Sequence, residues 1–596
     1  MKVQNELDGK NFFYMFFSGA KKILEHQQEI NKINVFPVPD ADTGTNLAST
    51  IRSVIDTIKP DRSYKATTGA IAEAALIGAR GNSGVIFAQF LNGLNEETCD
   101  CQSIGLKEFA ETLKGSVQYL YKAIAEPVEG TMITVIREWS EYIYQQKDTT
   151  TDFRTLFIKS LEVARQSLKE TPLKLKALAK ANVVDAGAKG FVVFLEGIIE
   201  FLTHRNVRNI MAAHREIEII EQIPDHVVED LTFRYCTEAL IKGVDLDDVA
   251  IKKIVQSHGD SVVIAGTSRL TRIHVHTNSP EILMQELRHT GTLAFQKVED
   301  MHMQYAAAYE RKWNIALVTD SACDLPEEFM EKYQVHLVPL NLFIGGNQYL
   351  DKRTIKPDQF YNMMEEIEEP FSTSQPSEKS FINLYSQLLT HYDSVISVHI
   401  SKKLSGTWRS SKMAAEKVMG ETGKTISVLN GRSISGGQGL QVLRVAQSIE
   451  NGLSHQAIVD QFESWADSTE ALVSVRSMKQ IVKSGRVSPL KGWIARILGI
   501  KPIIAVDNEG KTYLLDKSFT QIGNMKQVAK RIENMTKDRA VWNYVLLHAN
   551  NTEGARWFHE QLRPVLNQEP LATMNVSPVI GAHVGNKTVA VIFMYQ

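Results

Sequence analysis

The spacing of apolar residues divides the chain into three regions. From residue 1 to about residue 205, apolar positions recur three and four residues apart, as in Ala66–Ala79, Ser103–Ile124 and Arg154–Leu168. This spacing is typical of amphipathic helices, because 3.6 residues make one turn. Strand-like alternation is scarce here, so we predict an all-helical domain over residues 1–205.

The pattern changes in the middle of the chain. Strand-like segments at Val227–Ile241, Asp260–Gly266 and Thr271–Asn278 enclose helix-like segments at Asp245–Gly259 and Ser279–Gly291. Strands that alternate with helices in this way are typical of a small α/β unit with a βαβ-like order. We predict that this domain covers residues 206–312.

Strand and helix patterns alternate from residue 313 to residue 596, beginning with the buried-type strand in Asn314–Pro326. A turn-forming sequence at Val506–Lys511 predicts a hairpin between two strands. This region is predicted as an α/β domain. Its clearest further strands are Ser394–Ile400, Thr425–Asn430, Lys501–Val506, Thr512–Lys517, Tyr544–Asn550 and Thr588–Gln596.

Composition narrows the class of protein. The 596 residues exceed what one hydrophobic core holds, and the net charge of −3 argues against nucleic acid or an anionic membrane as the main partner. The longest apolar run, Gly190–Leu202, contains acidic residues and is too short to span a bilayer. The four cysteines fit reduced thiols, and the first residues do not resemble a signal peptide, so we expect a multidomain cytoplasmic protein.

The segment Ile33–Thr50 combines prolines, paired carboxylates and a helix start. Pro37 and Pro39 favour an extended backbone, in which Asp40 and Asp42 project to the same side. Two such carboxylates suit Mg²⁺, and the residues after them supply hydroxyls and helix N–H groups that suit phosphate: Thr43, Gly44, Thr45 and Asn46. The same residue types are also common turn formers and helix caps, so the spacing leaves both interpretations open.

Three further breaks repeat the combination of glycine and small polar residues before a helix. They are Gly78–Val85 with Gly81, Asn82 and Ser83, Pro127–Glu138 with Gly130 and Thr131, and Asn182–Phe191. Each alone is equally consistent with a tight turn between helices. If they converged at one end of a helical bundle, they would form a nucleotide site.

His274 and His276 lie two residues apart on a predicted strand and therefore share a face. With Cys236 from a neighbouring strand they would offer three ligands to zinc. Glu238 and water are candidates for the fourth ligand, and two ordinary histidines beside a buried thiol are the alternative interpretation.

Polar residues follow several strands of the last region. Hydroxyls, a guanidinium and an imidazole are donors that suit one carboxylate, and ligands usually bind at the carboxyl ends of strands in open α/β sheets. Caps of the following helices are the alternative role for the hydroxyls. The residues are Thr373, Ser374, Ser401, Ser405, Thr407, Arg486 and His583.

These motifs together resemble known families. Ile33–Leu47, Gly78–Ile86, Pro127–Glu138 and Val183–Gly190 resemble, in order, the loops of the ATP-binding (DhaL-like) domain shared by dihydroxyacetone kinase and the fatty-acid kinase. Tyr235–Ile241, His274–Asn278 and Gly291–Gln304 resemble the middle domain of the fatty-acid kinase. The last region resembles the DegV family of fatty-acid-binding proteins at Val318–Pro326, Thr373–Ser377, Leu404–Trp408, Ser484–Ser488, Lys501–Ile504 and Gly581–Gly585.

The resemblance implies a helical barrel that binds ATP and two Mg²⁺ ions, with Asp40 and Asp42 as ligands and Asn34 near a further ligand position. It implies a middle domain that forms a homodimer and can hold Zn²⁺ at the cysteine and two histidines. It also implies an α/β DegV domain of two subdomains with a fatty acid in an apolar tunnel. The carboxylate of that fatty acid would be bound by the residues matched by Thr373, Ser374, Ser405, Arg486 and His583. Kinase and acyl carrier are usually separate proteins, whereas here they are expected to be fused.

The ATP-binding region departs from the family at three places, and Trp408 of the last region stands where tyrosine is usual. Ala41 replaces the glycine between the two aspartates, and Asn182 and Ala188 replace glycines near Val183. A Cβ at position 41 could weaken nucleotide binding if φ there is positive. Because both aspartates are present, an active kinase is favoured.

The resulting hypothesis is ATP-dependent phosphorylation of a fatty-acid carboxylate to an acyl phosphate, with Asp40, Asp42 and Arg486 in catalytic roles. The family suggests an acyl-phosphate acceptor enzyme of phospholipid synthesis as the downstream partner. A lipid-binding protein with a regulatory or inactive nucleotide domain is one alternative. A kinase for a small hydroxylated substrate, as in dihydroxyacetone kinase, is the other.

Overall fold

The computed structural model describes residues 5–36, 42–150, 152–204, 232–366, 371–477 and 500–596. The chain divides into two compact units, Met1–His302 and Met303–Gln596. Each unit is described by itself below. No helix within the described residues is both long enough and apolar enough to cross a membrane.

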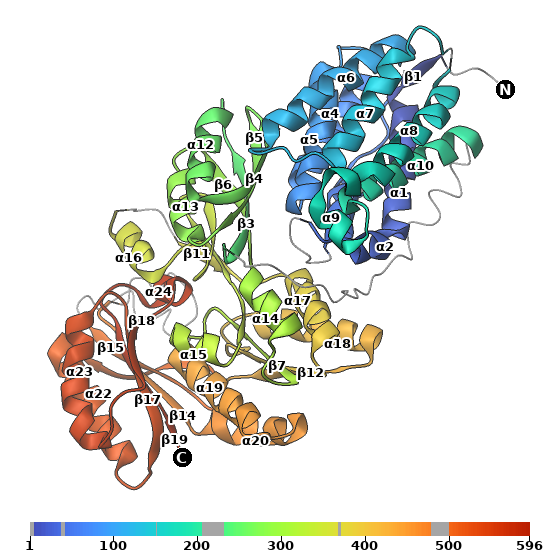
Figure 1. The fold of residues 1–596 in the computed structure, drawn as a ribbon. Helices are drawn as coiled ribbons and strands as arrows, with labels where there is room; N and C mark the ends of the chain where they lie inside the picture. The colour runs from blue at the N-terminus through green and yellow to red at the C-terminus, as the bar shows by residue number, and fades with distance from the viewer. Residues whose placement is uncertain (1–4, 37–41, 151, 205–231, 367–370, 478–499) are drawn as a thin grey trace. The chain divides into compact units, whose positions relative to one another are not determined.

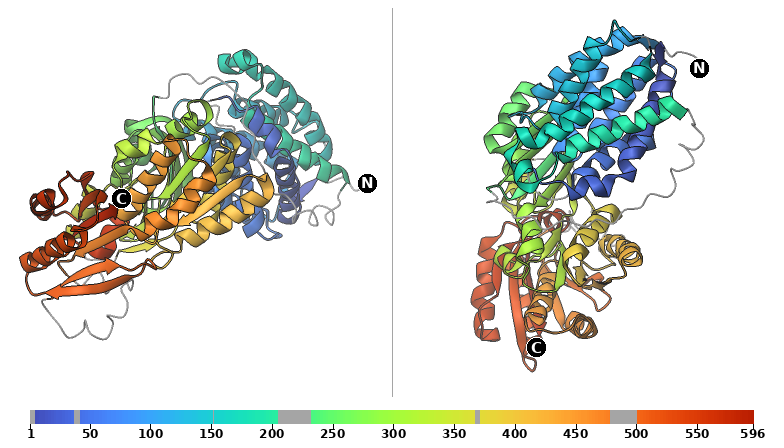
Figure 2. Two further views of the ribbon diagram at one scale, coloured as in Figure 1. Left: turned by 90° about the horizontal axis from the view of Figure 1, so that it is seen from below. Right: turned by 45° about the vertical axis from the view of Figure 1, so that its right-hand side comes forward.

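The first part of unit 1 is a bundle of helices, coloured blue to teal in Figures 1 and 2. A short antiparallel pair, β1 (Glu6–Asp8) with β2 (Ser103–Gly105), is added to the predicted all-helical pattern. The helices are α1 (Gly9–Glu25), α2 (Gln27–Lys32), α3 (Thr43–Thr57), α4 (Tyr64–Gly78), α5 (Gly81–Glu97), α6 (Leu106–Ala123), α7 (Met132–Gln145), α8 (Phe153–Lys174), α9 (Lys176–Ala181) and α10 (Ala186–His204).

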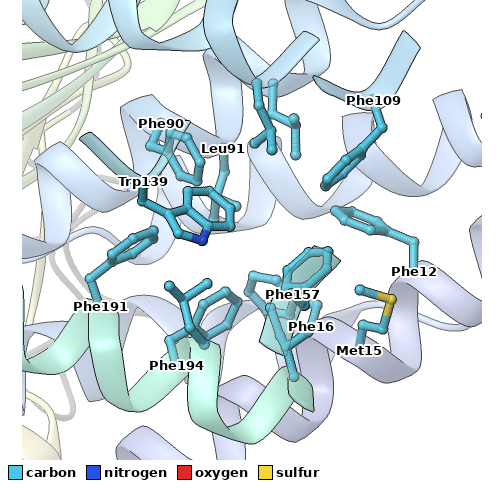
Figure 3. A pocket seen from close by; sticks show the side chains of 14 residues that line it. Phe12, Met15, Phe16, Phe90, Leu91, Phe109, Trp139, Phe157, Phe191 and Phe194 are labelled. Carbon is cyan, nitrogen blue, oxygen red and sulfur yellow. The ribbon is translucent and has the colours of Figure 1, made fainter. Parts of the chain in front are cut away.

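Aromatic side chains fill the centre of this bundle. Figure 3 shows rings from α1, α5, α6, α7, α8 and α10 pointing toward one another. Trp139 packs edge-on against Phe191, and its Nε1 donates to Ser160 Oγ over 3.0 Å. The space left between these side chains is about 30 Å³, which is close to the volume of one water molecule. The described side chains around this space are therefore closely packed.

The second part of unit 1 is a small sheet with two helices. Its elements are β3 (Tyr235–Lys242), α12 (Asp248–His258), β4 (Gly259–Thr267), β5 (Leu270–Thr277), α13 (Pro280–Leu287) and β6 (Thr292–Asp300). The strand order is β4-β5-β3-β6, and every neighbouring pair is antiparallel. Each helix therefore connects two strands of the same direction that have another strand between them. The predicted βαβ-like order is therefore present in its split form, in which another strand lies between the two strands that a helix connects.

Alternation along the strands gives this sheet two different faces. Thr271 lies on the face toward α12, where its hydroxyl donates to Asp248 over 3.0 Å. Leu240, Val263, Ala265 and Leu270 lie on the other face and belong to the same apolar core as the helical bundle. The sheet is therefore packed on both sides, which explains why every residue of β5 is buried.

The described residues of unit 2 form three sheets. The first is parallel, in the order β13-β12-β7-β8, with β7 at Ile315–Asp320, β8 at His336–Val338, β12 at Ser394–His399 and β13 at Thr425–Asn430. The second has the order β16-β15-β14-β19-β17-β18, with β14 at Thr469–Ser474, β15 at Lys501–Val506, β16 at Thr512–Ser518, β17 at Val541–His548, β18 at Ala572–Asn575 and β19 at Val589–Tyr595. The third is antiparallel and joins β9 (Asn341–Ile344) to β10 (Asn347–Leu350) and β11 (Ser372–Ser374).

Helices pack around these sheets, and the two larger sheets confirm the predicted α/β domain of two subdomains. The predicted hairpin is also present, because β15 pairs antiparallel with β16 and Gly510 turns the chain with φ of 82°. The helices are α15 (Glu327–Lys332), α16 (Pro357–Glu366), α17 (Glu378–His391), α18 (Thr407–Thr422), α19 (Gly436–Glu450), α20 (His455–Asp467), α22 (Gln521–Thr536), α23 (Thr552–Leu566) and α24 (Pro578–Val584), while α14 (Met301–Tyr309) spans the division between the units.

Candidate functional site

The N-termini of four helices meet at one end of the helical bundle. A Cβ atom added to Gly187, in the first turn of α10, would lie 3.2 Å from Ser83 Oγ of α5 and 3.4 Å from Met132 Cβ of α7. A Cβ added to Gly81 would lie 2.1 Å from Asn46 Nδ2 of α3. The glycine-containing segments that the sequence singled out therefore converge. Helix N-termini offer unpaired N–H groups and a partial positive charge, which together favour an anion such as phosphate.

Asp42 is the residue directly before α3. Its side chain does not cap that helix, so the capping role that the sequence left open does not apply to it. It therefore stands at the N-terminal end of one of the four converging helices, and carboxylate oxygen is a preferred ligand of Mg²⁺. The other predicted ligand, Asp40, and the substituted Ala41 lie outside the described residues.

Thr43, Gly44, Thr45 and Asn46 form the first turn of α3, and their contacts are mainly structural. Thr45 Oγ1 accepts from Gln27 Nε2 and Asn31 Nδ2, each over 3.0 Å. Gly44 lies so close to Gln27 that a Cβ there would stand 2.2 Å from the Gln27 carbonyl oxygen. These contacts hold α2 against the start of α3. Because they engage the Thr45 hydroxyl, the backbone groups at that end are the ones available to bind a phosphate.

Gly130 and Thr131 shape the loop before α7. Gly130 has φ of 86°, and its N–H donates to Thr134 Oγ1 over 2.9 Å. The Thr131 hydroxyl donates to the Val128 carbonyl over 2.8 Å. Both predicted residues therefore contribute by holding the loop conformation at the start of α7.

Sequence reasoning missed Asp185, which precedes α10. Its buried carboxylate accepts from the Ala188 N–H over 2.7 Å and also from the Met132 N–H, so it links the starts of α10 and α7. Burial raises the pKa of Asp185 to about 6. A single aspartate before a helix has no distinctive spacing, so only the packed loops reveal this role. Nearby, Asn182 adopts a left-handed φ of 54°, a conformation that asparagine accepts almost as readily as the glycine it replaces.

Cys236, His274 and His276 come together in the small sheet, as the sequence predicted. Their ligand atoms lie within 4.8 Å of one another, and Cys236 Sγ is 3.9 Å from His274 Nδ1. Burial lowers the pKa of His274, which favours the neutral ring that binds metal. Asp260 lies 3.5 Å from His276 Nδ1 and can orient that ring. The three side chains fit a zinc ion.

Glu238 was a candidate for the fourth ligand, but its contacts favour a different role. Its Oε1 accepts from the Gly81 N–H over 2.6 Å, and its Oε2 lies 2.5 Å from Arg272 Nη2. With both oxygens engaged, the carboxylate would have to release a partner in order to bind a metal.

Unit 2 contains a cavity of about 380 Å³ whose walls are mostly aliphatic. Thr373, Ser374, Ser405 and His583 all line it, as the sequence predicted. Thr373 Oγ1 lies 2.9 Å from His583 Nε2, which joins β11 to α24. The apolar side chains of the lining are Ala322, Leu340, Ile400, Leu404, Ile434, Val473, Val475, Ile504, Val506, Val579, Ile580 and Val584.

The polar residues of the cavity come from loops that touch. A Cβ added to Gly406 would lie 1.9 Å from Gln375 Oε1, so the segment after β11 contacts the segment before α18. Ser405 Oγ is 2.8 Å from Thr407 Oγ1 within that second segment. Ser401 instead donates to the Gly510 carbonyl over 2.6 Å, which gives it a structural role. Arg486 lies outside the described residues.

Comparison with protein-family models assigns all three regions. Residues 37–200 match the DAK2 domain, and residues 232–308 match the FakA-like middle domain of fatty acid kinase. Residues 314–596 match the model described as "Uncharacterised protein, DegV family".

Curated relatives match about half of the chain. An uncharacterized protein of Staphylococcus saprophyticus is 31% identical over 318 residues, which are 52% of this chain and 58% of the relative. Protein YloV of Bacillus subtilis is 30% identical over 315 residues, which are 50% of this chain and 57% of that protein. The chain thus spans less than two thirds of the length of either relative.

Solved structures also match about half of the chain. DegV, a fatty acid binding protein from Bacillus subtilis, is 26% identical with a TM-score of 0.44, over 48% of this chain and 100% of that chain. A structure titled as fatty acid binding of a DegV family protein from Thermus thermophilus is 25% identical with a TM-score of 0.44, over 48% of this chain and 100% of that chain.

Proposed function

Because this chain joins a DAK2 domain, a FakA-like middle domain and a DegV-family domain, we propose that it is an ATP-dependent fatty-acid kinase that contains its own acyl carrier. Its product would be an acyl phosphate. The observation that carries the proposal is the cavity of about 380 Å³, with aliphatic walls and a small polar group, in the same chain as four converging helix N-termini.

The cavity suits a fatty acid for physical reasons. Burial of apolar surface stabilises an alkyl chain by about 0.8 kcal/mol for each CH₂ group removed from water. The hydroxyls of Thr373, Ser374 and Ser405 and the ring of His583 offer hydrogen bonds to a carboxylate. A small hydroxylated substrate would leave most of the aliphatic wall without contacts, so the cavity favours a lipid over it.

The helical site suits the triphosphate of ATP. The first turns of α3, α5, α7 and α10 would bind phosphate oxygens through backbone N–H groups. Asp42, together with Asp40 two residues before it, would hold Mg²⁺. That ion would neutralise negative charge on the phosphates. The Oδ1 atom of Asn82 is buried without a partner among the described residues, which makes it available to a ligand at this site.

In the proposed reaction a carboxylate oxygen of the fatty acid attacks the γ-phosphorus in line with the departing oxygen. One P–O bond forms to the carboxylate and the bond to the β-phosphate oxygen breaks, so the products are acyl phosphate and ADP. No general base is required, because a carboxylic acid is already ionised at neutral pH. Joining the carrier to the kinase raises the effective concentration of the acyl group at the nucleotide site, within one chain or between two chains.

The test is ADP release by the purified full chain with Mg·ATP and fatty acids of different lengths. We expect ADP release that depends on the fatty acid and saturates with it. Fatty-acid binding without ADP release would favour a lipid-binding protein with a regulatory nucleotide domain. ADP release that requires dihydroxyacetone or a similar small alcohol would favour the small-molecule kinase.

A further inference from the structure

One face of the small sheet of unit 1 is charged as well as apolar. Neighbouring strands place Glu238 of β3 opposite His274 of β5, and Arg272 lies two residues before His274 on the same face. This is the face that joins the apolar core of the helical bundle. The charged groups are therefore buried between the sheet and the helices, where each requires a partner.

Glu238 connects the sheet to the start of α5. Its side chain is 1% exposed, and its Oε1 accepts from the Gly81 N–H over 2.6 Å. Its Oε2 lies 2.5 Å from Arg272 Nη2 and 3.6 Å from Arg80 Nη1. Both oxygens of the carboxylate are therefore fixed by partners.

The partner of this carboxylate is the first residue of a helix in the candidate nucleotide site. Gly81 has φ of 55°, and its N–H is one of the amides that a helix leaves without an internal partner. Among the described residues, the next two amides, those of Asn82 and Ser83, have no hydrogen-bond acceptor. Glu238 thus satisfies the amide that begins the turn and leaves the following two available for an anion.

The local charge also permits an anion to bind. Glu238 contributes one negative charge, whereas Arg80 and Arg272 contribute two positive charges. Both guanidinium groups lie over the ring of Phe295, at 4.2 Å and 4.9 Å from its centroid. The group therefore carries a net positive charge beside the start of α5 and does not repel phosphate.

We propose that Glu238 is a positioning residue for the nucleotide site: it fixes the first turn of α5 from the middle domain, so that nucleotide affinity in the helical domain depends on the middle domain. This inference rests on the proposed function only where it takes the anion at α5 to be a nucleotide. By linkage, a bound nucleotide would strengthen the contact between the sheet and α5 by the same factor.

Two variants of the full chain separate positioning from general stability. Glu238→Gln keeps an oxygen that can accept from Gly81 but removes the charge. Glu238→Leu combined with Arg272→Met removes the acceptor and both buried charges, so that no charge is left buried alone. The matched control is Glu286→Gln, which removes an ion-pair carboxylate 3.2 Å from His258 on the helix-covered side of the same domain.

The measurements are the Kd for Mg·ATP by calorimetry and hydrogen exchange of the peptide that spans Gly81–Val85. We expect the double variant to raise the Kd at least tenfold and to lose protection at this peptide, while melting cooperatively and keeping fatty-acid binding in unit 2. Glu238→Gln should lie between wild type and the double variant, and Glu286→Gln should match wild type. A merely structural role would lower the melting temperature without moving the Kd.

A Kd within twofold of wild type in a folded double variant would overturn the proposal, as would unchanged protection of the peptide. If wild type binds no nucleotide, the proposed function and the nucleotide part of this inference both fail. Loss of protection in the double variant would then still support the anchoring of α5 by Glu238, so the two failures are distinguishable.

Discussion

The candidate nucleotide site and the cavity of unit 2 offer different parts of the chain to a ligand. At the first site, side chains such as Thr45, Asp185 and Glu238 hold the loops, and backbone amides at the helix starts are left to bind an anion. In the cavity, side chains themselves form the lining. Most of them are aliphatic, and the hydrogen-bonded pair Thr373 and His583 is polar. Substitutions at the first site should therefore act through loop geometry, and those in the cavity through volume and direct contact.

The largest expected effect is that of Asp42→Asn, which alters the carboxylate that directly precedes α3 and is proposed to hold Mg²⁺. Removal of charge neutralisation at the transferred phosphate should lower kcat by about 10²–10³-fold or more. Fatty acid bound to unit 2, measured by mass spectrometry of the purified protein, should stay at the wild-type level. Wild-type turnover in this variant would exclude Asp42 from catalysis.

A second large effect is expected when the cavity is filled. Ile504 lines the cavity and is 4% exposed, so Ile504→Trp should occupy space that an alkyl chain needs and weaken fatty-acid binding about 100-fold, from the loss of several buried CH₂ groups. Ile504→Val is the matched control and should cost only about 0.5–1.5 kcal/mol of stability while keeping the lipid. Nucleotide affinity should be unchanged in both, and lipid retained by the tryptophan variant would show that the acyl chain lies elsewhere.

Gly81→Ala tests the dependence of the helical site on backbone geometry. The residue has φ of 55°, and the new Cβ would lie 2.1 Å from Asn46 Nδ2, so we expect a loss of roughly 1–3 kcal/mol in stability and weaker Mg·ATP binding. Gly420→Ala in α18 is the control, because nothing lies within 4 Å of its Cβ position. That helix should gain about 0.5–1 kcal/mol, as measured by urea unfolding. Equal effects at the two glycines would contradict the backbone argument.

A pH effect of intermediate size is expected at Asp351, which is buried in unit 2 and accepts from the Val579 N–H of α24 over 3.3 Å. Burial raises the pKa of Asp351 to about 7 from an ordinary value of 3.8. Between these values the folded protein keeps a proton that the unfolded chain releases, so stability falls as the pH rises from about 4 to about 7. Asp351→Asn should abolish this fall in stability, which amounts to about 2–4 kcal/mol. The free energy of unfolding at each pH is measured by hydrogen exchange of unit 2 peptides. A variant with the wild-type pH profile would assign the titration to another group.

The smallest effect is expected for Thr373→Val, which removes one hydroxyl from the cavity and leaves its volume nearly unchanged. Loss of a single hydrogen bond among several should weaken fatty-acid binding by about 1 kcal/mol, or roughly fivefold. The effect should be absent for a fatty alcohol or an alkane probe of the same length if the hydroxyl contacts the carboxylate. Equal losses for acid and alkane would show that Thr373 acts on the shape of the cavity instead.

The sequence predicted the elements because their signals are local. Helical spacing before residue 205, alternation around Cys236 and His274, and glycine before each of several helices all lie within short windows. The strand spacing of two also placed His274 and His276 on one face, and the structure brings Cys236 of the neighbouring strand to them. The polar residues expected at the strand ends included Thr373, Ser374, Ser405 and His583, which line one cavity, but also Ser401 and Thr407, which are not among its lining residues.

The contacts between distant segments were not predictable in this way. Glu238 and Gly81 are 157 positions apart, and a glutamate on a strand has no motif that announces a helix in another domain as its partner. The burial of Arg272 depends on the sheet being covered on both faces, which strand alternation in β5 does not reveal. Asp185 gained its role only when the starts of α7 and α10 came together.

The most direct test of the account is a single-turnover reaction of the full chain loaded with one fatty acid, mixed with Mg·ATP and trapped with hydroxylamine. Hydroxylamine converts an acyl phosphate to an acyl hydroxamate, which mass spectrometry identifies. We expect one hydroxamate for each ADP formed, none with a non-hydrolysable ATP analogue, and formation slowed by about 10²–10³-fold or more in Asp42→Asn. ADP formed from the loaded protein without any hydroxamate would contradict the proposed acyl phosphate.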